Sequence, residues 1–261
     1  MSSEKKLTVK RIVIFIVISF IPLMIVIPTL WTVYGEPLYA SENEQLAVIS
    51  YIVGVFAMMI PSAANLITRL ITKEGFANSY LGVHFGGKGG YWFASIAVKL
   101  VEGWAELFLL WAIFMNDTAF HEVYPNINMP NIGAYLLQLS FSVIIFFPAF
   151  GEEWGWRGYM MPKLLTLMPK PAAIVVGGVI WGLWHAPLTV AGHNFGIDYS
   201  GYPFVGILVM CLFCVMMNCF LTLVTEKTRS IYPASFIHMI TNNMSAAILL
   251  TIFGSEAAIQ K

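Results

Sequence analysis

The stretch IVIFIVISFIPLMIVIPTLWTVY, residues 12–34, indicates the fold class because it contains no charged residue. A helix needs about 20 mostly apolar residues to cross a hydrocarbon core about 30 Å thick, and this stretch is long enough. It is longer than the apolar part of a secretory signal and has no convincing small-residue cleavage site after it. We therefore expect residues 12–34 to form a transmembrane helix.

Six further apolar segments meet the same length requirement. They cover residues 46–66, 91–114, 132–149 with an extension to 165, 172–190, 204–224 and 231–253. Of the 261 residues, 58% are hydrophobic and 11% are charged, whereas soluble domains carry about 25% charged residues. The sequence predicts an all-α, polytopic membrane helix bundle of about seven transmembrane helices, or eight, in a single membrane-embedded domain over residues 1–261.

Basic residues are expected to lie on one side of the membrane. Lys5, Lys6, Lys10 and Arg11 precede the first segment and should hold the N-terminus in the cytoplasm. Alternation from there predicts the same side for the basic loop residues Arg69, Lys73, Lys88, Lys163, Lys170, Lys227 and Arg229, and the outer side for Lys261. We expect a multi-pass protein of the cell membrane, with the lipid bilayer as a partner. The net charge of +0 gives no indication of a nucleic acid partner.

Three other patterns are interpreted as structural. Cys211, Cys214 and Cys219 lie inside segment 204–224 and are best explained as small packing residues. The glycine-rich run 84–90 lacks the G-x-x-x-x-G-K-[ST] pattern of a phosphate loop, so a flexible interfacial loop is expected. The third pattern is a charged stripe on segment 91–114, formed by Lys99, Glu102 and Glu106 at i, i+3 and i+4 spacing. It predicts a structural salt bridge or, alternatively, the rim of a substrate channel.

Three polar patches interrupt the apolar segments. The first is Gly151-Glu-Glu-Trp-Gly-Trp-Arg-Gly158, the second is Trp181-Gly-Leu-Trp-His-Ala-Pro187, and the third places His238 and Asn242 one helical turn apart. An ionisable side chain in the bilayer costs on the order of 3 kcal/mol or more, so such residues are functional candidates. Their joint occurrence in one bundle favours a single polar site.

The spacing of the first patch predicts a division of roles between its two carboxylates. Glu153 and Arg157 are four residues apart, the distance at which a Glu and an Arg meet on a helix. Glu152 points about 100° away on the helix and is free for proton transfer. Two imidazoles, those of His185 and His238, and the amide of Asn242 would complete a hydrolytic centre that activates water and stabilises an oxyanion.

Each patch also has a structural explanation. Glu153 and Arg157 could form a buried ion pair whose only role is stability. His238 and Asn242 could link helices by hydrogen bonds, as His and Asn do in membranes. His185 could bond to backbone groups that Pro187 frees. These alternatives stay open at the level of the sequence.

The three patches resemble the motifs of the CPBP family of intramembrane proteases, which includes the type II CAAX prenyl endopeptidases and bacteriocin-processing and immunity proteins. The family's Glu-Glu-x-x-x-Arg is matched by Glu152, Glu153 and Arg157. The family's second motif is an aromatic residue followed four positions later by a His, which here are Trp181, in place of the usual Phe, and His185. Its third motif, His-x-x-x-Asn, is matched by His238 and Asn242. The resemblance spans about residues 132–245, which would be the catalytic core.

The resemblance implies that Glu152 acts as a general base and His185 orients the water, while His238 and Asn242 stabilise the oxyanion. Glu153 and Arg157 would brace the site. We expect no metal cofactor, and the zincin pattern H-E-x-x-H is absent from the sequence. If a metal binds, the expected Zn²⁺ ligands are Glu152, His185 and His238.

The resulting hypothesis is a CAAX protease-like glutamic endopeptidase that cleaves a membrane-associated peptide or protein. Two other classes are kept open. A non-catalytic bacteriocin-immunity or scaffold protein would keep the polar residues for stability. A proton-coupled transporter would use the Glu and His residues as a proton relay, although the chain has no evident two-fold repeat.

Overall fold

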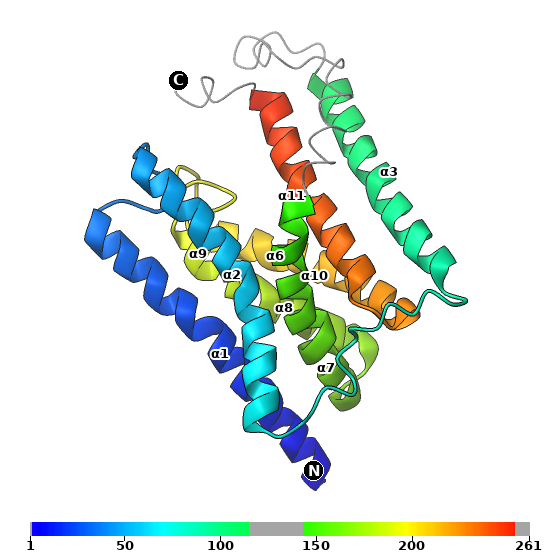
Figure 1. The fold of residues 1–261 in the computed structure, drawn as a ribbon. Helices are drawn as coiled ribbons and strands as arrows, with labels where there is room; N and C mark the ends of the chain where they lie inside the picture. Colours follow the sequence, from blue (N-terminus) through cyan, green and yellow to red (C-terminus); the bar gives the residue numbers. More distant parts are fainter. Residues whose placement is uncertain (1, 115–142, 254–261) are drawn as a thin grey trace.

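The computed structural model describes residues 2–114 and 143–253, and every regular element in those ranges is helical. Figure 1 shows the arrangement of the elements. In chain order they are α1 (Ser3–Tyr34), α2 (Glu44–Ile71), α3 (Gly89–Phe114), α6 (Val143–Gly155), the π-helix η2 (Trp156–Met160), α7 (Met161–Leu167), α8 (Lys170–Trp184), α9 (Ala186–Val190), α10 (Phe204–Thr228) and α11 (Tyr232–Phe253).

Helices α1, α2 and α10 are long and apolar enough to cross a membrane, judged by length and composition over the described part of the chain. Helix α8 is apolar but shorter. The all-helical membrane class is therefore confirmed, while the number of seven spans stays a prediction. The fourth expected segment begins outside the described residues at 132–142, and its extension is present because α6, η2 and α7 continue one helical path to Leu167.

The expectation of one helix over residues 172–190 is wrong. Helix α8 ends at Trp184, His185 is its C-cap, and the short helix α9 begins at Ala186. Pro187 has no backbone N–H and therefore cannot continue the hydrogen-bond ladder of α8. The break places His185 at a junction between two helices.

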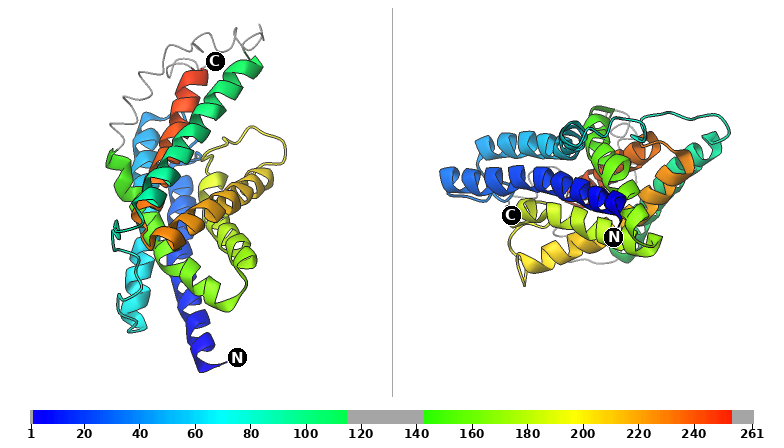
Figure 2. Two further views of the ribbon diagram at one scale, coloured as in Figure 1. Left: turned by 90° about the vertical axis from the view of Figure 1, so that its right-hand side faces the viewer. Right: turned by 90° about the horizontal axis from the view of Figure 1, so that it is seen from below.

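Helix α6 lies between α2 on one side and α11 on the other, and α8 packs along α10. Figure 2 shows α1 and α2 side by side along one edge of the molecule, with α3 and α11 together on the opposite side. All three helices that carry the polar patches, α6, α8 and α11, therefore belong to one packed bundle.

Glycines allow two of these helix pairs to approach closely. A Cβ added at Gly155 on α6 would lie 2.6 Å from the carbonyl oxygen of Pro61 on α2, and one at Gly151 would lie 2.8 Å from that of Met58. On α8, a Cβ at Gly182 would lie 2.5 Å from the Cα of Cys211 on α10. Spacing of small residues by four positions lets helix backbones meet in membranes, so these glycines set the position of the polar segments.

An aromatic cluster fixes α1 against the π-helix. The ring of Phe15 contacts those of Trp156 and Tyr159, each at 5.3 Å between centroids. Trp184 of α8 packs edge-on against Trp156, and its Nε1 donates to the backbone oxygen of Ser19 at 3.0 Å. The cluster is buried and therefore fixes η2 against α1 and α8.

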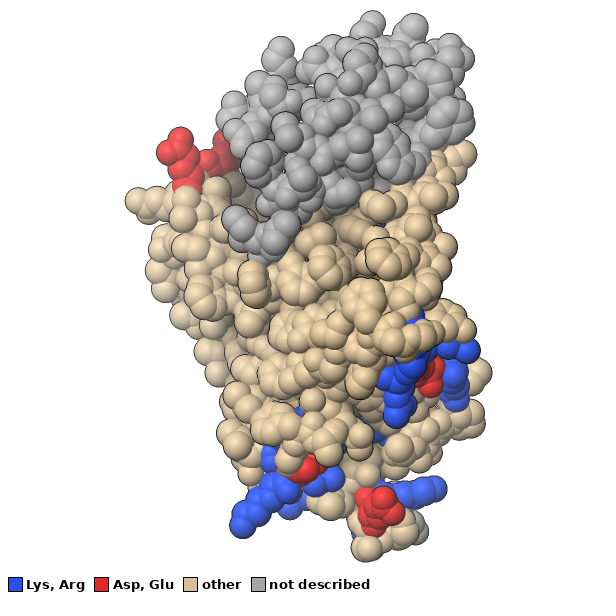
Figure 3. All heavy atoms as spheres, turned by 45° about the vertical axis from the view of Figure 1, so that its right-hand side comes forward, with Lys and Arg blue, Asp and Glu red and all other residues tan. Residues whose placement is uncertain are grey.

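Charged residues gather at the end of the bundle where the chain begins (Figure 3). There, Glu74 of the α2–α3 loop forms ion pairs with Arg11 at 3.3 Å and Lys163 at 2.7 Å, and accepts a hydrogen bond from Tyr159. Burial raises the pKa of Glu74, but Lys163, Tyr159 and Arg11 lower it by more, so the pKa of this carboxyl is below its ordinary value. Glu74 thus brings Arg11 and Lys163 together at this end, the side of the membrane stays a prediction, and Lys261 lies outside the described residues.

The expected salt bridge on α3 joins Lys99 Nζ to Glu102 Oε1 at 3.1 Å. The third member of the stripe, Glu106, has a side chain outside the described part. The pair confirms the structural interpretation of Lys99 and Glu102.

Substitution of Gly155 by Ala should lower the stability of the bundle, because the added methyl group would meet the backbone of Pro61 on α2. Overpacking of this kind costs about 1–3 kcal/mol. The matched control is Gly86→Ala in the α2–α3 loop, where an added Cβ meets nothing within 4 Å. Thermal unfolding of the two variants in the same detergent measures the difference, and equal stability would contradict the close α2–α6 packing.

Candidate active site

The two adjacent glutamates lie in the last turn of α6, directly before the π-helix that carries Arg157. Glu152, Glu153 and Arg157 are 2%, 0% and 1% exposed, so three ionisable groups are buried within six residues of chain. π-Helical turns are rare and occur frequently at functional sites. The wide turn is therefore an independent indication that this segment has a specific role.

Glu153 is the centre of the buried polar cluster. Its Oε1 accepts a hydrogen bond from Arg157 Nη1 at 3.0 Å and from His238 Nδ1 of α11 at 2.8 Å. The predicted Glu153–Arg157 ion pair is thus present. His238 joins this pair from another helix, α11. Because an ionised carboxylate only accepts hydrogen bonds, Nδ1 of His238 carries the hydrogen and Nε2 is left for other partners.

Trp181 connects the cluster to α8. Its Nε1 donates to Glu152 Oε2 at 2.8 Å, and the guanidinium of Arg157 lies over its ring at 4.0 Å. The ring also meets the imidazole of His238 edge-on, at 5.5 Å between centroids. The sequence identified Trp181 only as the aromatic residue of the second motif. Its contacts with Glu152, Arg157 and His238 could not be foreseen from that position.

His185 lies beside the cluster and not inside its hydrogen-bond network. Its Nδ1 is 3.0 Å from the backbone oxygen of Trp181, and its ring is 6.0 Å from the indole ring of Trp181. Cys214 of α10 is fully buried, with its Sγ 4.0 Å from the same Nδ1. The structure thus brings His185 to the site through Trp181, and it places Cys214, which the sequence treats as a packing residue, in contact with that imidazole.

Asn242 follows His238 by one turn of α11 and is partly exposed. Its side chain forms no hydrogen bond with another described residue. The next residue, Asn243, is 5% exposed, and its Nδ2 is buried. Asn242, like His185, therefore lies outside the hydrogen-bond network of the cluster, and no described contact links it to the cluster.

Helix α2 also supports the glutamate segment, through a hydrogen bond to its backbone. Asn65 of α2 donates from Nδ2 to the backbone oxygen of Trp154 at 2.9 Å, and its Oδ1 accepts from Arg69 Nε at 2.7 Å. Arg69 in turn lies over the ring of Tyr159, 5.1 Å from its centroid. The sequence analysis missed this support, although a buried Asn within the apolar segment 46–66 was a signal for it.

The alternative zinc ligands do not form a three-ligand set. Within residues 2–114 and 143–253, no three His, Cys, Asp or Glu side chains are placed to hold one metal ion. Glu152 is bonded to Trp181, His185 to the oxygen of Trp181 and His238 to Glu153. We therefore derive no chemical step through a metal.

Comparison with known proteins places the patches in one family. Residues 134–244 match the family model described as type II CAAX prenyl endopeptidase Rce1-like, and this range contains all the residues described above on α6, α8 and α11. This part of the chain is similar to the CAAX protease family. This confirms the resemblance inferred from the three motifs.

A CAAX family relative is the CAAX prenyl protease 2 of Methanococcus maripaludis, which is 26% identical over 123 residues. The match covers 46% of this chain and 45% of the relative, so it spans about half the length of each.

Proposed function

We propose that this protein is an intramembrane endopeptidase that hydrolyses a peptide bond of a membrane-associated peptide or protein. The observation that carries the proposal is the buried carboxylate of Glu152, held by the indole of Trp181 beside the Glu153–Arg157–His238 cluster. A lone carboxylate in such surroundings is costly. The match of residues 134–244 to the type II CAAX prenyl endopeptidase family model supports the same reaction class.

In this proposal Glu152 is the general base. Trp181 Nε1 fixes Oε2, which leaves Oε1 to take a proton from water. The water oxygen forms a bond to the peptide carbonyl carbon, and the proton passes from Glu152 to the amine nitrogen as the C–N bond breaks. Both protons of the water are then accounted for, one on the leaving amine and one on the new carboxyl group.

The two histidines are suited to different parts of this reaction. Each has its Nδ1 engaged, His185 with the oxygen of Trp181 and His238 with Glu153, so each has Nε2 available. A neutral His185 with hydrogen on Nδ1 can accept a hydrogen bond from the attacking water at Nε2. His238, with Glu153 and Arg157 beside it, can donate from Nε2 to the oxyanion as an imidazolium, with Asn242 as the second donor.

Arg157 and Glu153 are assigned a positioning role. Arg157 joins η2 to α8 through the ring of Trp181, and Glu153 joins α6 to α11 through His238. Together they hold the three helices at fixed separations around Glu152. No metal is required in this scheme, and Zn²⁺ held by Glu152, His185 and His238 remains the alternative that a chelator tests.

Glu152→Gln should abolish cleavage of a membrane-peptide library by the purified protein while the unfolding temperature stays near that of the wild type. General base catalysis contributes about 10²–10⁴-fold to a rate, so a loss of at least 10²-fold is expected. A chelator should leave wild-type cleavage unchanged. Full activity of the variant would refute the role of Glu152 and favour an immunity or scaffold function, and loss of wild-type activity with chelator would favour zinc.

Trp181→Phe should lower cleavage by about tenfold or more, because Glu152 loses a hydrogen bond of about 1–3 kcal/mol in a desolvated site. Trp184→Phe is the matched control, since it removes an equivalent indole bond from the same helix, directed at Ser19 of α1. Both variants should lose similar stability in thermal unfolding. Equal activities of the two variants would contradict the assignment of Trp181 to the site.

A further inference from the structure

A polar pocket lies between the α2–α3 loop and the turn that joins α10 to α11, and no residue of the buried cluster lines it. Its volume is about 510 Å³, within the range of about 300–1,000 Å³ typical of small-molecule sites. Residues 76–82 form one wall, and His84, Lys88 and Arg229 complete it. The sequence analysis treated the run 84–90 only as a flexible loop.

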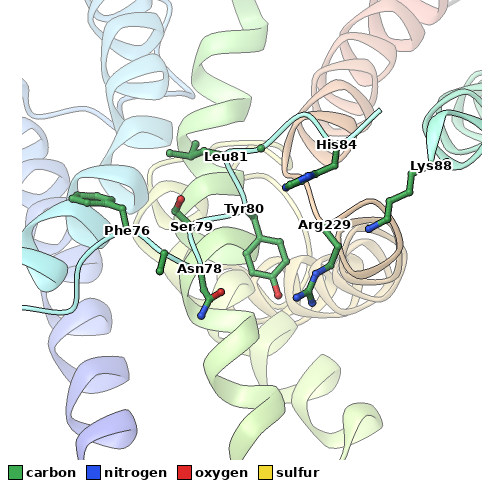
Figure 4. A pocket seen from close by; sticks show the side chains of 10 residues that line it. Phe76, Asn78, Ser79, Tyr80, Leu81, His84, Lys88 and Arg229 are labelled. Atoms are coloured by element: carbon green, nitrogen blue, oxygen red, sulfur yellow. The ribbon is translucent and has the colours of Figure 1, made fainter. Parts of the chain in front are cut away.

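The lining of this pocket contains two permanent cations and no acidic residue. In Figure 4, Lys88 and His84 lie on the same side as Arg229, whose guanidinium is next to the ring of Tyr80. Neither Lys88 nor Arg229 forms an ion pair with an acid of the described chain. The pocket therefore carries uncompensated positive charge.

Two acids near this pocket are engaged with other cations. Glu74 pairs with Arg11 and Lys163, and Glu226 pairs with Lys170. Neutral donors add to the two cations of the pocket: the wall includes the amide of Asn78 and the hydroxyl groups of Ser79 and Tyr80. Charged and neutral donors around one cavity are the chemistry that binds a phosphate group.

The backbone of the pocket is held in unusual conformations. Tyr80, His84 and Arg229 have φ angles of 58°, 45° and 57°, in the left-handed region that side chains other than Gly rarely occupy. Such strain persists where surrounding structure enforces it and concentrates at ligand sites. Here Ile231 N donates to Tyr80 O at 3.0 Å and Arg69 donates to Asn78 O at 3.3 Å, which fixes the loop from both sides.

We propose that this pocket binds the phosphate group of an anionic lipid headgroup or of a free phosphate. It lies at the basic end of the bundle, which the positive-inside rule assigns to the cytoplasmic leaflet with its anionic lipids. Basic pockets between transmembrane helices on that side bind lipid headgroups. The proposal is independent of the peptidase function, since none of its residues belongs to the buried cluster.

Occupation of the pocket would act on a loop that contacts the catalytic helices. A Cβ at Gly158 of the π-helix would lie 3.1 Å from the oxygen of Ser79, and the loop's bond to Ile231 lies at the start of α11. A bound phosphate would therefore also stabilise the packing of the loop against η2 and α11.

The test uses the full chain in detergent, titrated with phosphatidylglycerol and followed by native mass spectrometry. The double variant Lys88→Gln with Arg229→Gln should raise the concentration for half-binding of the first lipid by about tenfold or more. The control Lys6→Gln with Lys10→Gln removes the same charge from the same end of the molecule, and should change it by less than about twofold. The charge-conserving pair Lys88→Arg with Arg229→Lys should retain binding.

Inorganic phosphate is the second probe. Displacement of the lipid by phosphate would support a site that reads the phosphate group, and thermal stabilisation by phosphate without lipid binding would support a free phosphate as the ligand. Equal losses in the pocket and control double variants would overturn the proposal, because binding would then follow overall charge. Failure of the wild type to bind either probe would overturn it as well.

Discussion

The carboxylate of Glu153 holds α6 and α11 together, because a single oxygen accepts hydrogen bonds from Arg157 and from His238. In an apolar interior each of these groups would be costly alone, and removing one partner of a buried charge pair costs about 3–5 kcal/mol. The three groups therefore need one another. Glu152, one residue before this junction, takes its position from it.

The polar cluster also depends on how closely the helix backbones approach. Gly151 and Gly155 bring α6 against α2, and Gly182 brings α8 against α10. The π-turn at Trp156–Met160 and the break at His185 then direct side chains that a regular helix would point elsewhere. Aromatic packing around Trp156 and Trp184 holds these irregular turns in place. Backbone packing and site geometry are thus two aspects of one arrangement.

Much of this arrangement could be predicted from the sequence because local spacing determines it. The helical class follows from apolar segment length, and the Glu153–Arg157 pair follows from i, i+4 spacing on a helix. The hydrogen bond between Glu153 and His238 joins residues 85 positions apart. It could not be predicted, because hydrophobic periodicity does not give the position of one helix along the axis of another. For the same reason the support from Asn65 was missed. Pro187 indicates a disturbed helix near His185, but the apolar pattern does not give the residue at which α8 ends.

The roles of individual site residues stay predictions, and Asn242 has the least structural support among them. The central claim is the coupling between Glu153 and His238. A double-mutant cycle with Glu153→Gln, His238→Gln and the double variant, followed by unfolding in detergent, measures it most directly. We expect a coupling energy above about 1.5 kcal/mol, well beyond the average of about 0.6 kcal/mol for polar pairs in membranes. Losses that add within about 0.5 kcal/mol would show independent residues and contradict the account.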